Sequence, residues 1–253
     1  MCLLAVGTSY KVVRSQIIVN MSKEIIAIIK ELENIQELLN TNRELVRSKI
    51  EGIQPFDRRI TIFTQLFGIL DRAKMGFEFS YCSLDSKEIK TRMFADLTND
   101  EFLQRINAFI HFMAIEMNQS YFSIIEAFLR QIHRSIITDP PESFWRLTKS
   151  ISVTLDLPHW SQFLNFYRLV RNTLHNNGLF FPNDKKDVEV LYRGKTFSFI
   201  YGKKIHFLDA DLRLTLVSDG NSFVYDVCTS QKVIVYTDIP DPSHFDYIPV
   251  PEN

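Results

Sequence analysis

The chain has 253 residues, of which 45% are apolar and 13% are aromatic, so it can bury a full hydrophobic core. This composition excludes disorder over most of the length. The formal net charge of -1 at pH 7 excludes a uniformly basic nucleic-acid binder, although a local basic patch is compatible with a neutral total.

The first fifty residues are predicted to end in a long helix. Residues 8–20 are β-branched and short, and they fit either a strand or the first turns of a helix. From residue 22 to about residue 50, apolar side chains recur at spacings of three and four, which predicts an amphipathic helix. Gly52 and Pro55 end it, because glycine favours helix C-termini and proline cannot continue a helix.

A second helix is predicted for residues 57–76 from the same periodicity. Residues 77–99 are predicted to be a loop with a short helix near residues 86–94. Thr98 and Glu101 then match a capping box, in which each side chain binds the other residue's backbone N–H. We therefore expect a further helix from Glu101 onward.

The longest helical period in the sequence runs over residues 101–136. It predicts either one unusually long helix or a helix bent near residues 118–120. The Asp-Pro-Pro sequence at residues 139–141 ends it, because proline lacks the N–H that a helix interior requires. A shorter helix is predicted for residues 142–151.

Residues 166–178 combine packing with polar chemistry in one predicted helix. At about 100° per residue, four polar side chains share an arc of roughly 100°: Arg168, Arg171, Asn172 and His175. The apolar side chains lie on the opposite side: Phe163, Phe166, Tyr167, Val170 and Leu174. The sequence Asn-Asn-Gly at residues 176–178 is predicted to end the helix, because these residues tolerate the left-handed conformation.

The polar face is suited to metal-free cleavage of RNA, whose 2′-hydroxyl supplies the nucleophile. An imidazole can take the proton from that hydroxyl, and guanidinium groups can stabilise the charge that develops on the phosphoryl oxygens. His175 is the candidate acid/base group, and its place near a helix C-terminus is expected to favour the protonated form. Asn172 is a candidate for orienting the phosphate or the imidazole. The alternative is the solvated face of an amphipathic helix, with His175 and the asparagines as its C-cap.

Glu126, Arg130 and His133 are predicted to share a face of the long helix, because they stand at i, i+4 and i+7. Glu126 and Arg130 are candidates for supporting residues that orient the helix of His175. The alternative is a surface ion pair with a spare histidine.

Beyond Pro182 the apolar residues alternate, which predicts a β-hairpin or a three-stranded flap at about residues 187–207. Residues 193–194 and 202–203 are its predicted turns. Six basic residues interleaved with aromatic rings are candidates for RNA contacts: Lys185, Lys186, Arg193, Lys195, Lys203 and Lys204. The alternative is that the lysines protect an edge strand while the aromatic rings pack on the helices.

The periodicity of residues 209–229 fits either strands around a turn or a helix capped by Asp209. Residues 233–236 are predicted to form a short strand, and the proline-rich residues 239–253 a tail.

The segment at residues 166–178 resembles the signature helix of the HEPN superfamily, all-α domains of which many are metal-independent endoribonucleases. The family's motif is an arginine, usually followed by a polar residue such as asparagine, and then a histidine after four to six residues. Arg171 and Asn172 match its start, but only three residues separate Arg171 from His175, whereas six separate Arg168 from His175. Either arginine is therefore a candidate for the motif arginine.

The resemblance covers roughly residues 100–230 and implies a mainly α fold, a helical bundle of HEPN type with a β-hairpin inserted after the motif helix. It also implies a helix at residues 209–229. We therefore expect an N-terminal helical region at residues 1–97, a HEPN-like domain at residues 98–238 and a tail at residues 239–253.

The function that the resemblance implies is that of a metal-independent endoribonuclease in a toxin or anti-phage defence setting, with RNA as its substrate and an antitoxin protein as a further partner. Its catalytic candidates are Arg171, His175, Asn172 and Arg168. Two copies of the helix across a two-fold axis would form one composite cleft, so a homodimer is expected. The alternative is a non-catalytic HEPN-like protein that binds RNA or dimerises.

The cysteines and apolar segments predict a cytoplasmic location. Cys2, Cys82 and Cys228 are odd in number, far apart and without ligand spacing, which predicts neither a disulfide framework nor a zinc site. The most apolar stretch, residues 102–117, is interrupted by polar and charged side chains, and the apolar residues 2–6 have no basic region before them. We expect no membrane span, no metal and no cofactor.

Overall fold

The computed structural model describes residues 3–242, with side chains from residue 16 onward. Within that part the protein is mainly helical, with a small two-stranded sheet. The elements in chain order are α1 (Leu3–Lys49), α2 (Arg58–Asp85), α3 (Lys87–Met93), α4 (Asn99–Ile136), α5 (Phe144–Thr154), the 3-10 helix η1 (Pro158–Trp160), α6 (Ser161–His175), β1 (Val188–Tyr192), β2 (Lys195–Phe199), α7 (Ala210–Thr229) and α8 (Gln231–Ile234).

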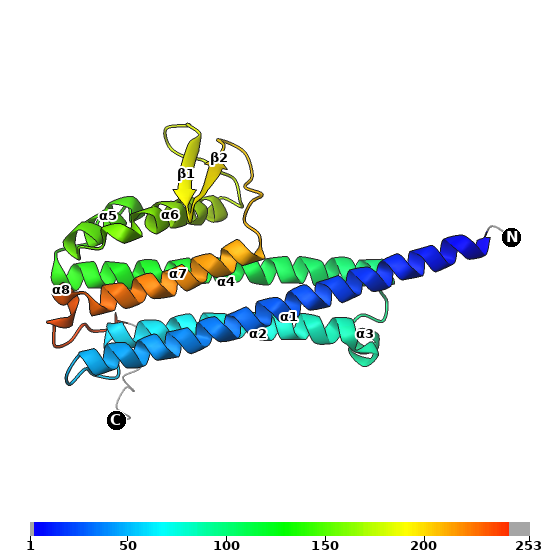
Figure 1. The fold of residues 1–253 in the computed structure, drawn as a ribbon, viewed down its shortest axis with the longest axis horizontal. Helices are drawn as coiled ribbons and strands as arrows, with labels where there is room; N and C mark the ends of the chain where they lie inside the picture. The colour runs from blue at the N-terminus through cyan, green and yellow to red at the C-terminus, as the bar shows by residue number, and fades with distance from the viewer. Residues whose placement is uncertain (1–2, 243–253) are drawn as a thin grey trace, which may run out of the picture.

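The long helices form a bundle in which α1 packs on α2 and α7, and α4 packs on α2 and α7. The shorter helices α5 and α6 pack on α4, and the hairpin β1–β2 packs on α6 (Figure 1). The N-terminal end of α1 extends past the rest of the bundle (Figure 1). The buried residues of all these helices form one continuous core, which crosses the expected boundary at residue 97.

Both helices of the N-terminal region are longer than the sequence indicates. Residues 8–20, which fit a strand or a helix, belong to α1. The helix predicted to end at Gly76 continues to Asp85, so most of the predicted loop before residue 86 is helical. A Cβ at Gly76 would lie 2.8 Å from the Cε of Met113. Gly76 therefore lies against the Met113 side chain of α4, and it does not end the helix.

Helix α4 is a single helix of 38 residues, so the long alternative is correct. The predicted capping box is present at its start. The Thr98 hydroxyl accepts the backbone N–H of Glu101, and the Glu101 carboxylate accepts the backbone N–H of Thr98. The two bonds satisfy N–H groups that the first turn of a helix leaves without partners.

The predicted hairpin has two strands, paired antiparallel from Val188 opposite Phe199 to Tyr192 opposite Lys195. Its turn has positive φ angles at Arg193 (49°) and Gly194 (74°), as a tight hairpin turn requires. Residues 209–229, for which the periodicity left two structures open, are helical in α7. Asp209 caps that helix by accepting the backbone N–H of Leu212.

The strand predicted at residues 233–236 is wrong, because this segment contains the end of α8 and a turn. The fully buried guanidinium of Arg59 donates to the carbonyl oxygens of Val233 (3.0 Å) and Tyr236 (2.8 Å), which fixes the turn from outside the segment.

The tail predicted from residue 239 also begins inside the packed structure, since Ile239 and Asp241 are buried. Arg58 pairs with Asp241 at 3.1 Å, and the backbone N–H of Ile239 donates to Asp57. The rest of that prediction, residues 243–253, lies outside the described residues.

In the described part of the chain, no helix combines the length and apolarity that crossing a lipid bilayer requires.

Candidate functional site

Helix α6 buries one side and presents the other, as its sequence predicts. The predicted apolar side is buried: Phe163, Phe166, Tyr167, Val170 and Leu174. On the polar side, Arg168, Arg171 and Asn172 are half-buried and His175 is exposed. The helix ends as predicted, with positive φ angles at Asn177 (55°) and Gly178 (82°). His175 is therefore the last residue of α6 and lies at its C-terminal end.

Arg171 is bound to helix α4. Its Nη2 lies 2.5 Å from Oε2 of Glu126, and its Nη1 donates to Oδ1 of Asn172 at 3.1 Å. The guanidinium also lies 5.5 Å from the ring centroid of Phe144, close enough for a cation–π contact. These contacts fix the guanidinium from three sides and offset its charge.

Glu126 binds a second arginine on its own helix. Arg130 donates through Nη2 to Oε1 of Glu126 at 2.7 Å, as the spacing on α4 predicts. Arg130 also donates to the carbonyl oxygens of Pro141 (2.7 Å) and Glu142 (2.8 Å). Glu126 and Arg130 thus join α4, α6 and the segment that leads into α5. His133 is a core residue, whose ring nitrogens lie 2.9 Å from the carbonyl oxygen of Thr138 and 2.9 Å from Oγ of Ser150.

Arg168 has different surroundings from Arg171. It donates to Oδ1 of Asn165 at 2.9 Å, and its guanidinium lies 5.1 Å from the ring centroid of Trp145. No carboxylate forms an ion pair with Arg168 among residues 16–242. Burial lowers the pKa of Arg168, because removing a cation from water disfavours its charged form. Arg168 is therefore a partly desolvated cation without an acidic partner in the described structure.

Arg168, Arg171 and Asn172 line one cavity of about 460 Å³. Two segments supply the aromatic residues of its wall: Phe144 and Trp145 lie on α5, and Phe180 and Phe181 follow α6. Asn176, Asn183 and Asp184 add polar groups. The cavity combines cations, aromatic rings and amides, which suits a ligand with both a phosphate and an aromatic base.

His175 does not line that cavity. Its side chain lies in a separate groove between α2 and α4, with Arg72, Glu116 and Gln119 among the lining residues. Partial burial of its ring lowers the pKa of His175, and the charge of nearby Arg171 lowers it further. The direction is opposite to the one expected from the helix C-terminus, because burial and the guanidinium together outweigh the raising effect of Glu126. A neutral imidazole at pH 7 is suited to act as a base.

The basic residues of the hairpin region are exposed, but they differ in their partners. Arg193 is paired with Asp219, its Nη2 lying 2.5 Å from Oδ1. Lys185 and Lys186 lie next to Asp184 at the cavity wall, whereas Lys195, Lys203 and Lys204 lie on the hairpin and its return.

The aromatic rings on the inner face of the hairpin pack on the bundle. Tyr192 stacks on Phe166 with ring centroids 4.5 Å apart, and Phe197 and Phe199 also contact Phe166. Tyr201 differs, since it is exposed and pairs with the exposed ring of Phe181. The packing alternative thus explains the three inner rings.

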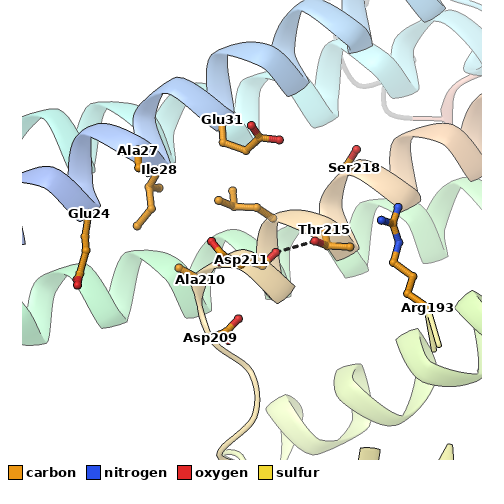
Figure 2. Close-up of a pocket in the computed structure, with 11 residues that line it drawn as sticks. Glu24, Ala27, Ile28, Glu31, Arg193, Asp209, Ala210, Asp211, Thr215 and Ser218 are labelled. Carbon is orange, nitrogen blue, oxygen red and sulfur yellow. Dashed lines mark hydrogen bonds between the residues drawn. The ribbon is translucent and has the colours of Figure 1, made fainter. Parts of the chain in front are cut away.

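A further cavity, of about 770 Å³, lies between α1, α7 and the hairpin turn (Figure 2). Glu24 and Glu31 line it from α1, and Asp209 and Asp211 line it from the start of α7. Its single lining cation, Arg193, is the residue already paired with Asp219. This acidic lining repels a phosphate backbone, so an RNA contact at Arg193 is electrostatically unfavourable. Among the described residues, no three His, Cys, Asp or Glu side chains are placed to hold a metal ion.

Comparison with known proteins adds no relative. No family model, curated protein or solved structure matches this chain. The resemblance to HEPN domains therefore stays a prediction from the sequence. Sequence reasoning missed Trp145 and Phe181, because each comes from a different segment. It named Glu126 as a candidate for orienting α6 but not Arg171 as its partner, because helical spacing relates only residues of one helix.

Proposed function

We propose that this chain is a metal-independent endoribonuclease of HEPN type, with His175 as the acid/base group and Arg168, Arg171 and Asn172 as the phosphate-binding residues. The observation that carries the proposal is the position of an exposed histidine of lowered pKa beside Arg171 at the end of α6. The cavity lined by Arg168 and Arg171 of the same helix supports the proposal. Its guanidinium groups are the cations that stabilise negative charge on a phosphodiester.

The chemistry needs no cofactor. His175 removes the proton from an RNA 2′-hydroxyl, the oxygen forms a bond to phosphorus, and the bond to the 5′-oxygen breaks as that oxygen takes a proton from water. Guanidinium groups stabilise the additional negative charge on the phosphoryl oxygens. The products are a 2′,3′-cyclic phosphate and a free 5′-hydroxyl.

The proposal includes a homodimer. In one chain, His175 opens onto the groove between α2 and α4, whereas Arg168 lines the other cavity. A second copy related by a two-fold axis would bring a further histidine and two further arginines to one cleft. Analytical ultracentrifugation at the concentration of the cleavage assay tests this part, and a monomer that cleaves RNA would contradict it.

The test of catalysis uses a single-stranded RNA with a fluorophore and a quencher in buffer containing EDTA. We expect cleavage by the wild type and at least a hundredfold loss in His175→Ala, since removing an acid/base group costs roughly 10²–10⁴ in rate. The control is His206→Ala, a change at another exposed histidine. A 2′-deoxy substitution at the cleaved position must also block the reaction. Equal rates for His175→Ala and the wild type would refute the assignment.

A second candidate function is RNA binding without cleavage. The ion pair between Arg171 and Glu126 favours it, because a neutralised arginine has less charge to offer a transition state. This candidate predicts that the wild type retains labelled RNA on a filter and leaves it intact, in a preparation free of contaminating nuclease.

A further inference from the structure

The cavity beside Arg168 has the composition of a nucleotide site. Arg168 is partly desolvated and has no acidic partner among residues 16–242, so an anion placed there would not compete with a carboxylate for it. Arg171 lies in the same wall, but Glu126 already offsets its charge. The anion is therefore expected to lie closer to Arg168 than to Arg171.

The aromatic part of the cavity is open to a ligand. Trp145 is 47% exposed and Phe181 is 49% exposed, which is high for rings of this size in a folded domain. Both line the cavity, together with the buried rings of Phe144 and Phe180. Exposed aromatic rings beside an arginine are how proteins hold unpaired bases, because every base can stack on a ring.

The amides of the cavity suit the edge of a base. Asn172, Asn176 and Asn183 each carry both donors and an acceptor. Asn172 already accepts from Arg171 through its oxygen, which leaves its NH₂ group to donate. The volume of about 460 Å³ falls within the range of about 300–1,000 Å³ that is typical of ligand sites.

One carboxylate opposes an anion in this cavity. Asp184 lines the wall, but its Oδ1 accepts the backbone N–H of Lys186 at 3.4 Å, and Lys185 and Lys186 lie next to it in the chain. The two exposed lysines that follow it in the chain add positive charge near this carboxylate.

We propose that this cavity is a subsite for one unpaired nucleotide of a single-stranded RNA, with the phosphate on Arg168 and the base against Trp145 and Phe181. The inference rests on RNA as the ligand of the proposed function, but it does not require cleavage. A base inside a duplex is stacked and paired, so duplex RNA is excluded from the subsite.

The experiment measures binding through the fluorescence of Trp145, with the other tryptophan removed as Trp160→Phe. The probe is a short RNA in which 2′-fluoro groups replace the 2′-hydroxyls, so it cannot be cleaved by attack of a 2′-oxygen. We expect quenching by the single strand, binding at least tenfold weaker for the duplex, and competition by a nucleoside monophosphate but not by ribose 5-phosphate or inorganic phosphate.

The binding of a labelled RNA to protein variants locates the site. Arg168→Gln and Trp145→Ala are each expected to weaken binding about tenfold, within the range for loss of one stacked base. The matched control is Arg146→Gln, an exposed arginine on the same helix as Trp145 that does not line the cavity. If the protein with Trp145→Ala proves unstable on heating, Trp145→Phe replaces it as the test. Because that variant keeps an aromatic ring, we expect it to retain most of the binding.

The outcomes separate this inference from the proposed nuclease. Binding with this pattern but no cleavage of natural RNA keeps the subsite and refutes the nuclease. Cleavage by the wild type, with unchanged KM and RNA affinity in both variants, keeps the nuclease and refutes the subsite. Equal binding of duplex and single strand, equal competition by inorganic phosphate, or no binding at all also refutes the subsite.

Discussion

Glu126 and Arg171 form an ion pair between α4 and α6, with Oε2 and Nη2 2.5 Å apart. Glu126 lies 14% exposed and binds Arg130 as well, so one carboxylate holds two guanidinium groups. A single acidic side chain thus ties the polar face of α6 to the long helix, beside the core contact of Phe122 with Tyr167.

Removing this carboxylate charge should loosen α6. Glu126→Gln is expected to lower the free energy of unfolding by about 1–3 kcal/mol, because two partly buried arginines lose a charged acceptor. Urea unfolding followed by circular dichroism measures the change. The matched control is Glu116→Gln, an exposed glutamate on the same helix, which should stay within about 0.5 kcal/mol of the wild type. A similar loss in both variants would show that Glu126 has no special role.

The pKa of His175 should depend on Arg171. In the wild type, we expect the NMR titration of His175 to have its midpoint below 6.5, because burial and the neighbouring guanidinium disfavour the protonated form. In Arg171→Gln the repulsive charge is gone while Glu126 remains, so the midpoint should rise. An unchanged midpoint would show that Arg171 does not act on His175.

The same pKa gives a pH dependence of stability. Because the pKa of His175 is lower in the folded protein than in the unfolded chain, the unfolded chain binds more protons at pH values between the two. The contribution of His175 to stability is therefore present above about pH 6.5 and is lost as the pH falls through the folded pKa. His175→Gln should remove this dependence, which urea midpoints measured from pH 5 to pH 8 would reveal.

The buried ion pair of Asp57 and Arg59 should be essential for stability. Both side chains are fully buried, and Nη2 of Arg59 lies 2.6 Å from Oδ2 of Asp57. Asp57→Asn leaves a buried guanidinium without its counter-charge, so we expect a loss of about 3–5 kcal/mol. The exposed Glu51→Gln is the control. A loss below about 1 kcal/mol in Asp57→Asn would show that the surroundings already compensate Arg59.

The aromatic rings near the hairpin should divide into packing and surface rings. Phe199 is fully buried, so Phe199→Ala is expected to cost about 3–5 kcal/mol in unfolding free energy. Phe181 is half exposed, so Phe181→Ala should cost less than about 1 kcal/mol while it weakens RNA binding. Thermal unfolding measures both variants. Equal costs would mean that Phe181 serves packing.

Local sequence signals predicted the elements that depend on neighbouring residues. The capping box of Thr98 and Glu101, the turn at Arg193 and Gly194, and the amphipathic division of α6 all depend on residues within a few positions of each other. The mainly helical fold followed from the same signals. For residues 209–229 the periodicity fitted both strands and a helix, and only the family resemblance favoured the helix that the structure has.

The rest depends on contacts between distant segments. The periodicity ended the second helix at Gly76, yet that glycine lies inside α2 against the side chain of Met113 from another helix. Residues 233–236 read as a strand, but their turn is fixed by Arg59, which lies far away in the sequence. For the same reason, the spacing of Arg168 and His175 could not reveal that their side chains line different hollows.

The contacts of Arg59 also set an order of events during synthesis. Helix α2 leaves the ribosome early, whereas the carbonyl groups of Val233 and Tyr236 and the carboxylate of Asp241 are made more than 170 residues later. Until then, Arg58 and Arg59 have only their local acceptors, Gln65 and Asp57, and lack the distant ones. The start of α2 can therefore reach its fully packed state only after residue 241 has emerged.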